Sequence, residues 1–458
     1  MSKWPIKILL LFVRIVVYVA QPVIFFLWLS LNNVQLLIMN RTSLVTGFVF
    51  AVLMILFLRI YGGFEIGSKK SKPIIYSMAT AIVFADLISY IVLQIMNVND
   101  MNRANFVLFG SDLVFLFIVI LSQILLISVG VYIGNTVYFQ INPPKRCCLV
   151  TAECSDIKSI HRKINRYKLQ YQIEDFVRYD DPRLWEVLDR NQLVFVFEVP
   201  SKHRSRIVEY CYSRSIGMYY VPDVYDVISN SSARHIIDDV PLLGKEELRI
   251  RLVNRFAKRT LDLLVALPIT ILLSPVMLIT AVAIKIYDKG PAFYKQTRLT
   301  VGGKEFKLLK FRSMIVNAEM DGIARLAQEN DGRITPVGRV LRRTRLDELP
   351  QLFNILSGDM SLVGPRPERP EIAEEYEKVL PEFRLRLKVK AGLTGYAQVY
   401  GKYNTEPRHK LLFDLFYIET QSVWMDLNIL FKTVIVVFRK DATEEVEAGK
   451  THAGVEVK

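Results

Sequence analysis

The chain has 458 residues, of which 51% are hydrophobic, and its formal net charge is +14 at pH 7. Its mean hydropathy is positive, at +0.25. This length is sufficient for more than one domain. An apolar chain with a large basic excess is typical of a membrane protein with a basic cytosolic side, and it argues against a soluble protein that binds nucleic acid.

The chain contains only four cysteines: Cys147, Cys148, Cys154 and Cys211. None of them forms a Cys-x-x-Cys pair, and no His and Cys cluster has the spacing of a zinc site. We therefore expect reduced thiols in a cytosolic segment. For the vicinal pair at 147–148 we favour a buried strand position over a redox function.

Four long apolar segments come first, near residues 6–31, 43–61, 74–96 and 106–138. Each is long enough to cross the hydrocarbon core, which needs about 20 helical residues. The first segment lacks a small-residue cleavage site, so we interpret it as a span and not as a cleaved signal peptide. Residues 1–142 are therefore predicted to form a four-helix transmembrane bundle.

Basic residues orient this bundle. Because basic residues favour the cytosolic side, both ends of the bundle are predicted to face the cytosol. The basic residues on the predicted cytosolic side are Lys3, Lys7, Lys69, Lys70, Lys72, Lys145 and Arg146, against Arg41 and Arg103 on the opposite connections. Arg14 and Asp86 lie within apolar segments, where we favour snorkelling or interhelical pairing over a lipid path.

After Pro143-Pro144 the composition becomes that of a soluble domain, over residues 143–245. Strand patterns at CCLVTAE, QLVFVFEV and GMYYVPDVYDV alternate with two amphipathic helices, which predicts a small parallel sheet. A dinucleotide site needs glycines in the turn after the first strand, and here that turn reads TAECSD. A structural or regulatory module is therefore favoured over nucleotide binding.

A second apolar region occupies residues 258–287. It is long enough to span the membrane, but basic residues flank both of its ends, and Ser274-Pro275 lies at its middle. Proline cannot donate to the helical ladder and disfavours helix at the residue before it. We predict a re-entrant helix-break-helix that dips into one leaflet, with the Ser274 hydroxyl as a partner for a freed backbone group. The alternative is a kinked fifth span.

The remaining residues divide into a basic domain, 250–440 including the re-entrant segment, and a polar tail, 441–458. The stretch YIETQSVWMDLNILFKTVIVVF near the end of this domain has aromatic and apolar faces with few charges. Such a stretch is able to lie at a membrane interface.

The run RRTRLDELPQLFNILSGDMSLVGPRPE contains the strongest chemical signal in the chain. It places the adjacent acids Asp347 and Glu348 among arginines and prolines. Pro350 is typical of a first helical turn, so we expect Asp347 at or near a helix N-terminus, where anions are stabilised. Adjacent residues on a helix point in different directions, so the two acids are predicted to have different roles. One is a candidate nucleophile, and both are candidate ligands of Mg²⁺. A capping acid beside a surface acid is the less favoured alternative.

Basic side chains near this pair are candidate phosphate ligands, because guanidinium groups bind phosphate oxygens in a bidentate manner. From the set Arg339, Arg342, Arg343, Arg345 and Arg366 we select Arg342 and Arg366. The strand-like segment FKLLKFRSM adds Lys310 and Arg312, which we expect to point to the same cleft. The glycines of KAGLTGYAQVYG are a weaker candidate for backbone contact with an anion.

Four segments in this order are similar to the bacterial sugar transferase family, the monotopic polyprenyl-phosphate phosphoglycosyl transferases. They are KRTLDLLVALPITILLSPVMLITAVAIKI, FYKQTRLTVGGKEFKLLKFRSM, the run containing Asp347, and KAGLTGYAQVYG. The similarity covers about residues 255–440. The four spans and the Rossmann-like module before it resemble the large, hexose-1-phosphate branch of the family.

The resemblance implies transfer of a sugar-1-phosphate, with glucose or galactose expected, from a UDP-sugar to undecaprenyl phosphate with release of UMP. It implies that Asp347 is the nucleophile, that Glu348 is the second member of the dyad, and that Mg²⁺ is required. It matches Arg342 and Arg366 to basic motif positions and Ser274-Pro275 to the re-entrant break. The implied fold is a membrane α+β protein with a four-helix bundle, a Rossmann-like module and a monotopic catalytic domain.

The resemblance also implies a place in the cell, a multi-pass protein of the bacterial inner membrane whose catalytic domain is cytosolic. Its partners would be the UDP-sugar, undecaprenyl phosphate and the bilayer, with a homodimer left open and no nucleic acid. The reaction would be the first membrane step of exopolysaccharide, capsule or O-antigen synthesis. Alternatives are an inactive membrane-anchored regulatory or scaffold protein and, ranked last, a nucleotide-sugar dehydratase.

Overall fold

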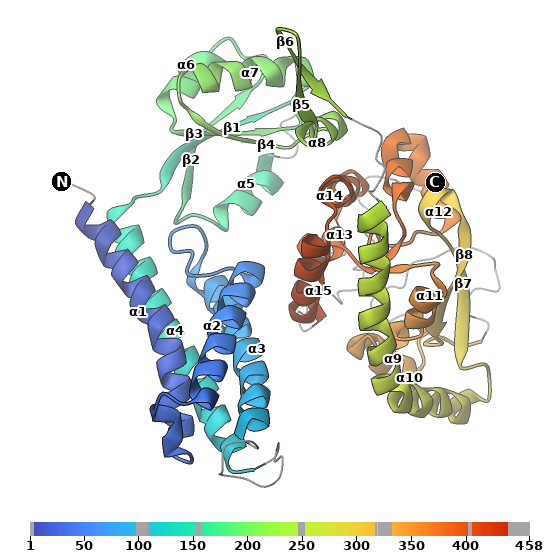
Figure 1. Cartoon of the computed structure of the whole chain (residues 1–458). Coiled ribbons are helices and arrows are strands. Elements are labelled where there is room, and N and C mark those ends of the chain that lie inside the picture. The colour runs from blue at the N-terminus through green and yellow to red at the C-terminus, as the bar shows by residue number, and fades with distance from the viewer. Residues whose placement is uncertain are drawn as a thin grey trace. The chain divides into compact units, whose positions relative to one another are not determined.

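A computed structural model gives the architecture of the chain (Figure 1). It describes residues 4–437 apart from 98–107, 109, 153–156, 246–251, 317, 319–331 and 402–404. The chain forms two compact units, Met1–Val221 and Pro222–Lys458. The predicted domain boundaries at 142, 245 and 440 stay predictions. The predicted polar tail, 441–458, lies outside the described residues, as do Arg103 and Cys154.

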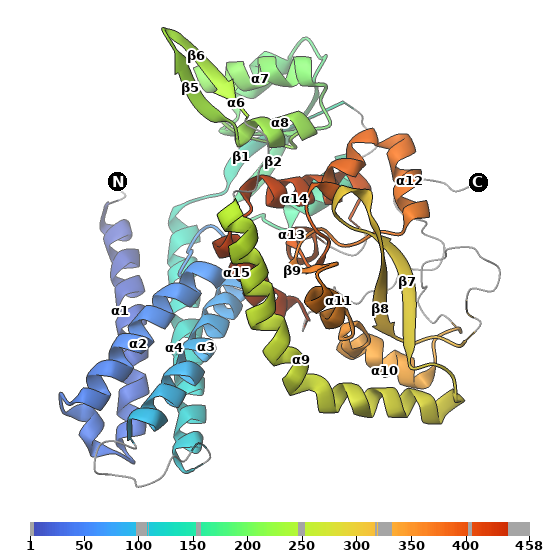
Figure 2. The same ribbon diagram turned by 45° about the vertical axis from the view of Figure 1, so that its right-hand side comes forward.

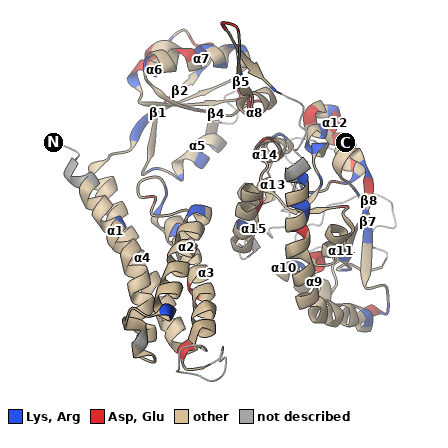
Figure 3. Ribbon diagram, in the orientation of Figure 1, with Lys and Arg blue, Asp and Glu red and all other residues tan. Residues whose placement is uncertain are grey.

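The four predicted apolar segments are helices in the first unit. They are α1 (Trp4–Ser30), α2 (Arg41–Tyr61), α3 (Ser71–Asn97) and α4 (Asp112–Ile141). Few charged side chains lie on them, as Figure 3 shows. Together with α9 of the second unit they make five described helices that are long and apolar enough to cross a membrane.

Polar side chains lie inside this helical bundle as well as on its surface. Asp86 is fully buried and accepts a hydrogen bond from Gln123 Nε2 at 3.3 Å, and the same amide nitrogen donates to the Gln21 carbonyl at 3.0 Å. Interhelical pairing is therefore confirmed for Asp86. Arg14, in contrast, lies over the ring of Tyr18 in its own helix.

The rest of the first unit is a four-stranded parallel sheet in the order β2-β1-β3-β4. Its elements are β1 (Lys145–Thr151), α5 (Ile157–Asn165), β2 (Tyr171–Arg178), α6 (Leu184–Arg190), β3 (Leu193–Phe197), α7 (Ser201–Ser213) and β4 (Gly217–Tyr220). The predicted parallel sheet and the buried position of Cys147 and Cys148 in β1 are confirmed. Strand β2 was not predicted. It is an edge strand whose exposed residues include several charged ones, so it lacks an apolar run.

The second unit contains one long helix, α9 (Leu252–Asp288). Before it come α8 (Val224–Asn230) and the hairpin β5 (Ala233–Ile237) and β6 (Val240–Gly244). Helix α8 corrects the predicted third strand, of which only Gly217–Tyr220 is extended, because Asp223 and Asp226 form a capping box that starts a helix. After it come the antiparallel pair β7 (Phe293–Leu299) and β8 (Glu305–Phe311), then α10 (Pro336–Thr344), α11 (Gln351–Ser357), β9 (Ser361–Val363), α12 (Pro370–Val379), β10 (Gly392–Thr394), α13 (Tyr396–Tyr400), α14 (Pro407–Thr420) and α15 (Val423–Val437).

Helix α9 is continuous through Ser274-Pro275, which corrects the predicted helix break. Its axis nevertheless turns sharply part-way along (Figure 2), and it contains Pro268 and Pro275. Because Pro275 has no N–H group, the Ile271 carbonyl loses its helical partner. The Ser274 hydroxyl donates to that carbonyl at 2.7 Å, so the predicted use of this side chain is confirmed.

The first part of α9 is anchored to the elements that hold the acidic run. The Arg259 guanidinium donates to the Ile355 and Leu356 carbonyls at the end of α11, at 2.6 and 2.8 Å. The Asp262 carboxylate accepts from the Leu362 N–H of β9 at 2.9 Å. Polar contacts of this kind fix the helix against the site region while its apolar side chains face outward.

Candidate active site

The adjacent acids lie in a short turn between two helices. Leu346–Glu348 form a single 3-10 turn after α10, and Pro350 caps the start of α11. Asp347 was predicted at or near the helix N-terminus and in fact lies in the 3-10 turn just before the observed start of α11. Arg345, which ends α10, has a left-handed backbone with φ of 60°. This conformation is uncommon for a residue other than glycine and is found at functional sites, and here it redirects the chain into the acidic turn.

Three cations converge on one oxygen of Glu348. Lys310 Nζ lies 3.5 Å from Oε1, Arg366 Nη2 also lies 3.5 Å away, and Arg345 Nη1 lies 3.7 Å away. Burial opposes ionisation of this carboxyl group, but Lys310, Arg366 and Arg345 outweigh it and lower the pKa of Glu348 to about 2. Glu348 is consequently ionised at neutral pH inside a positive cluster.

Asp347 has a different environment, although it is the next residue. Its side chain is 8% exposed, and among the described residues it makes no hydrogen bond or ion pair. Burial and the neighbouring Glu348 raise the pKa of Asp347 above its ordinary value, although Lys310, Arg342 and Arg345 act in the opposite direction. The site thus contains one ionised acid whose charge is balanced by cations, Glu348, and one acid without a direct partner, Asp347. Such a difference is typical of two carboxylates with separate roles.

Strand β8 delivers Lys310 to this pair because α11 fixes its register. The Asn354 side chain of α11 accepts from the Leu309 N–H at 2.9 Å and donates to the Lys307 carbonyl at 2.9 Å. The next residue along the strand, Lys310, then reaches Glu348. Strand β8 therefore brings Lys310 within 3.5 Å of Glu348.

The other predicted basic residues have different surroundings. Arg342 of α10 donates from Nε to the Ser313 hydroxyl at 3.0 Å, and its charge acts on Asp347. Arg312 pairs with Asp288 at the end of α9. This contact corrects the expectation that Arg312 points with Lys310 to one cleft. Phosphate binding by Arg342, Arg366, Lys310 and Arg312 stays a prediction.

The Pro-Arg-Pro turn is held by its carbonyl groups. Four consecutive carbonyl groups, from residue 365 to residue 368, accept hydrogen bonds. Two of the donors are backbone N–H groups: Gly392 donates to the Pro365 carbonyl at 2.9 Å, and Leu299 donates to the Glu368 carbonyl at 3.0 Å. The other two are guanidinium groups: Arg386 Nη2 donates to the Arg366 carbonyl at 2.9 Å, and Arg298 Nη1 donates to the Pro367 carbonyl at 3.0 Å. The donors come from β10, from the 3-10 segment Pro381–Lys388 and from β7. The turn is therefore fixed from three directions while the guanidinium of Arg366 reaches Glu348.

The glycines that were weak candidates for anion contact have another use. Strands β9 and β10 pair in parallel, and a Cβ atom on Gly392 would lie 2.0 Å from the Gly364 nitrogen. The Gly392 N–H is also committed to the Pro365 carbonyl. Glycine is needed at 392 because the backbones of the two strands approach closely. This segment therefore packs against the Pro-Arg-Pro turn and donates a hydrogen bond to it.

The carboxylates of Asp347 and Glu348 are of the ligand type that Mg²⁺ prefers, and a magnesium site at this pair stays a prediction. Mg²⁺ is usually held by one or two carboxylates plus substrate phosphates, and Asp347 has no competing direct partner in the described chain. The ion pairs of Glu348 all engage Oε1. Among the residues that the structure describes there is no group of three or more acidic, His or Cys side chains able to hold a metal without a substrate.

Several positions in the site were not predicted. Arg345 was counted among the arginines but not selected, and Arg298 and Arg386 were not considered. Arg386 is 4% exposed and paired with Asp414, which is 1% exposed. The only signal in the sequence was charge within apolar stretches such as EFRLRL and LLFDLF. Such stretches predict burial of a charge but not the identity of its partner.

Comparison with known proteins agrees with the resemblance. The family model described as bacterial sugar transferase matches residues 253–440. The chain is 41% identical over 227 residues to a UDP-glucose:undecaprenyl-phosphate glucose-1-phosphate transferase of Klebsiella pneumoniae, covering 48% of this chain and 49% of that protein. It is 38% identical over 232 residues to a UDP-N-acetylgalactosamine-undecaprenyl-phosphate N-acetylgalactosaminephosphotransferase of Aeromonas hydrophila, covering 50% and 54%.

A third relative is covered more completely. A UDP-glucose:undecaprenyl-phosphate glucose-1-phosphate transferase of Caulobacter vibrioides is 44% identical over 182 residues, which are 39% of this chain and 68% of that protein. The match to the Klebsiella and Aeromonas relatives spans only about half of their length. All three similarities, together with the family model, identify the same family. The chain belongs to the bacterial sugar transferase family.

Proposed function

We propose that this protein is a phosphoglycosyl transferase that moves a sugar-1-phosphate from a UDP-sugar to undecaprenyl phosphate and releases UMP. The observation that carries the proposal is the buried Asp347 carboxylate, which lacks a direct partner in the described chain and adjoins a cluster of cations around Glu348. Relatives that share this region are named for such transfers.

The proposed reaction has two displacements at one phosphorus atom. An oxygen of Asp347 attacks the phosphate that bears the sugar, a bond forms between that oxygen and phosphorus, and the bond to UMP breaks. A phosphate oxygen of undecaprenyl phosphate then attacks the same phosphorus, and the Asp347 carboxylate is released. Covalent catalysis suits two bulky phosphate substrates because they use one site in turn.

The cations around the acids supply the electrostatic part of the reaction. Lys310, Arg342 and Arg366 are proposed to bind the phosphate oxygens, whose negative charge they offset. Glu348 keeps Lys310 and Arg366 in place through its ion pairs. Asp347 and Glu348 are the proposed ligands of Mg²⁺, which when bound neutralises diphosphate charge and improves the leaving group.

We also propose how the protein lies in the membrane. Helices α1 to α4 cross the inner membrane, and α9 enters one leaflet and returns, with Pro275 at the bend. The catalytic residues then lie at the cytosolic face, where the acceptor phosphate meets a site while its prenyl chain stays in lipid. A homodimer is left open.

The proposed sugar is a hexose, glucose or galactose, and the reaction would be the first membrane step of an exopolysaccharide, capsule or O-antigen pathway. Relatives include proteins named for glucose, for galactose and for N-acetylgalactosamine. An N-acetylhexosamine is therefore the outcome to test against glucose and galactose. A panel of UDP-sugars with undecaprenyl phosphate and a UMP assay decides between them.

The test of the proposal is Asp347→Asn. This change keeps the size of the side chain but removes the nucleophilic oxygen, so we expect UMP release to fall by at least about 10³-fold. Expression and membrane insertion should match the wild type. Substantial residual turnover by the variant would contradict the covalent role. No UMP release by the wild-type protein with any UDP-sugar would favour the alternative, an inactive regulatory or scaffold protein.

A further inference from the structure

We infer that the buried pair Arg386 and Asp414 is a positioning device for Arg366, acting through the backbone of the Pro-Arg-Pro turn. The inference rests on the proposed function, because it is measured as transferase activity. Neither residue contacts Asp347 or Glu348 among the interactions of the described chain.

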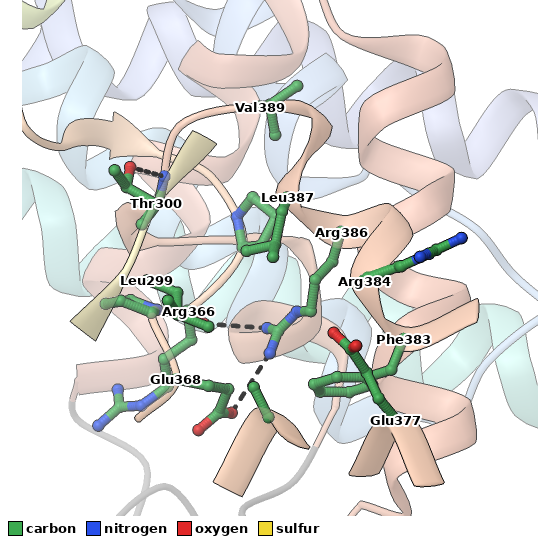
Figure 4. A pocket seen from close by; sticks show the side chains of 14 residues that line it. Leu299, Thr300, Arg366, Glu368, Glu377, Phe383, Arg384, Arg386, Leu387 and Val389 are labelled. Atoms are coloured by element: carbon green, nitrogen blue, oxygen red, sulfur yellow. Dashed lines mark hydrogen bonds and ion pairs between the residues drawn. The ribbon is translucent and has the colours of Figure 1, made fainter. Parts of the chain in front are cut away.

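The geometry of Arg386 points at the turn. Its Nη2 donates to the carbonyl oxygen of Arg366 at 2.9 Å, and Figure 4 shows this contact and the contact with Glu368. Its Nε donates to Asp414 at 2.9 Å, and its guanidinium lies 4.8 Å from the centre of the Phe383 ring. Contacts with Asp414, Glu368 and the Phe383 ring therefore fix the Arg386 guanidinium in the position from which it donates to the turn.

Arg366 needs external support because of its neighbours. Pro365 and Pro367 have no N–H groups, so the turn is anchored mainly through its carbonyls. The Arg366 side chain is 43% exposed, yet its guanidinium lies 3.5 Å from Glu348. A long, partly exposed side chain keeps a functional geometry only when the backbone that carries it is fixed. Arg386 supplies that fixed point at the same residue.

Direct binding of substrate by Arg386 does not fit its surroundings. Its charge is offset by Asp414 and Glu368, whose carboxylate oxygens lie 2.8 and 3.4 Å away. The cavity between the turn and the segment Pro381–Lys388 (Figure 4) has a volume of about 10 Å³, which holds no more than one water molecule. A phosphate or a sugar has no room there, so the effect of Arg386 must pass through the turn.

The experiment replaces the whole pair in the full-length protein, as Arg386→Met with Asp414→Leu. Removing both partners of a buried ion pair is often tolerated, whereas removing one leaves an uncompensated charge. We expect kcat for UMP release to fall about tenfold or more with KM for the UDP-sugar changed less than threefold. Arg384→Met, an exposed position in the same segment, is the matched control and should keep wild-type kcat.

The decisive comparison uses Arg366→Met with and without the pair replacement. If Arg386 acts through Arg366, the combined variant should be no slower than Arg366→Met alone. If the fold losses in kcat of Arg366→Met and of the pair replacement multiply in the combined variant, the two act independently and the inference is overturned. A pair variant with wild-type kcat would also overturn it. Should the pair variant fail to fold, Arg386→Lys replaces it. Lysine keeps the positive charge but lacks the planar guanidinium that donates to Asp414 and to the Arg366 carbonyl at once, and this variant is compared with Arg366→Met in the same way. An inactive wild type would instead refute the proposed function.

Discussion

At the scale of single residues, the main finding is that two adjacent acids have opposite properties. Glu348 is held ionised by three cations, and the pKa of Asp347 is raised by burial and by Glu348. The difference arises because Lys310, Arg345 and Arg366 form ion pairs with Glu348, whereas Asp347 is buried without an ion pair among the described residues. The sequence predicted different roles for the two acids but not which of them the cations bind.

The pH dependence of activity follows from the raised pKa of Asp347. Attack requires the carboxylate, so kcat/KM should rise with pH through that pKa, which lies above the ordinary value of 3.8. Arg342 lowers the pKa of Asp347, so Arg342→Gln should move the acid limb to higher pH. A pH profile of UMP release measures the shift.

Arg343→Gln is the control for this experiment, because Arg343 is an exposed neighbour on α10 and is not among the main groups that shift the pKa of Asp347. Its acid limb should coincide with that of the wild type. An Arg342 variant with a lower plateau but an unmoved limb would show that Arg342 does not act on the ionisation of Asp347.

At the scale of elements, the close packing of α10 positions the acidic turn. The Thr335 hydroxyl accepts from the Gly338 N–H at 2.9 Å and caps the helix. The Thr335 N–H donates to the Ser313 carbonyl at 3.1 Å. A Cβ atom on Gly338 would lie 1.9 Å from the Ser313 carbonyl oxygen. Helix α10 therefore packs directly on the backbone that follows β8, which brings Arg342 to the Ser313 side chain.

Gly338→Ala should consequently displace α10. Because the contact is with backbone and not with a flexible side chain, we expect a loss of about 1–3 kcal/mol in stability, with reduced UMP release. Thermal unfolding of the purified full-length protein measures the first effect. Gly332→Ala is the matched control, since a Cβ atom there has open space. Equal stability of the two variants would contradict the proposed packing constraint.

At the scale of the whole molecule, the site residues all lie in the second compact unit, Pro222–Lys458. The Caulobacter relative matches 39% of this chain and 68% of its own length, so it is shorter than this chain. Both observations support the proposal that the second unit carries the catalytic residues. The membrane helices of the first unit are then not part of the described acid and cation cluster.

The topology of α9 is a prediction at this scale. A reporter fused after Tyr287 should read cytosolic, because a re-entrant helix returns to the side from which it entered. Ser274→Leu combined with Pro275→Leu removes the proline at which we propose the bend, one of the two in α9, so the same fusion should move to the opposite side of the membrane. A wild-type reporter outside the cytosol would contradict the re-entrant proposal.

The sequence by itself determined the parts of this protein that depend on local pattern. Four apolar helices, the parallel strands β1 and β3, and the use of the Ser274 hydroxyl all follow from residues close together in the chain. Strand β2 was missed because an edge strand does not need an apolar run. The run that places Asp347 and Glu348 among arginines is also a local pattern, and it was one of the segments on which the resemblance to the family rests.

Only the tertiary structure decided which charges meet. Lys310 reaches Glu348 whereas Arg312, two residues later, pairs with Asp288. Arg386 and Asp414 meet across 28 residues. Partner choice between buried charges depends on how elements distant in sequence pack, because each buried charge must find an opposite charge or a hydrogen bond where the backbone places it. No local pattern contains that information.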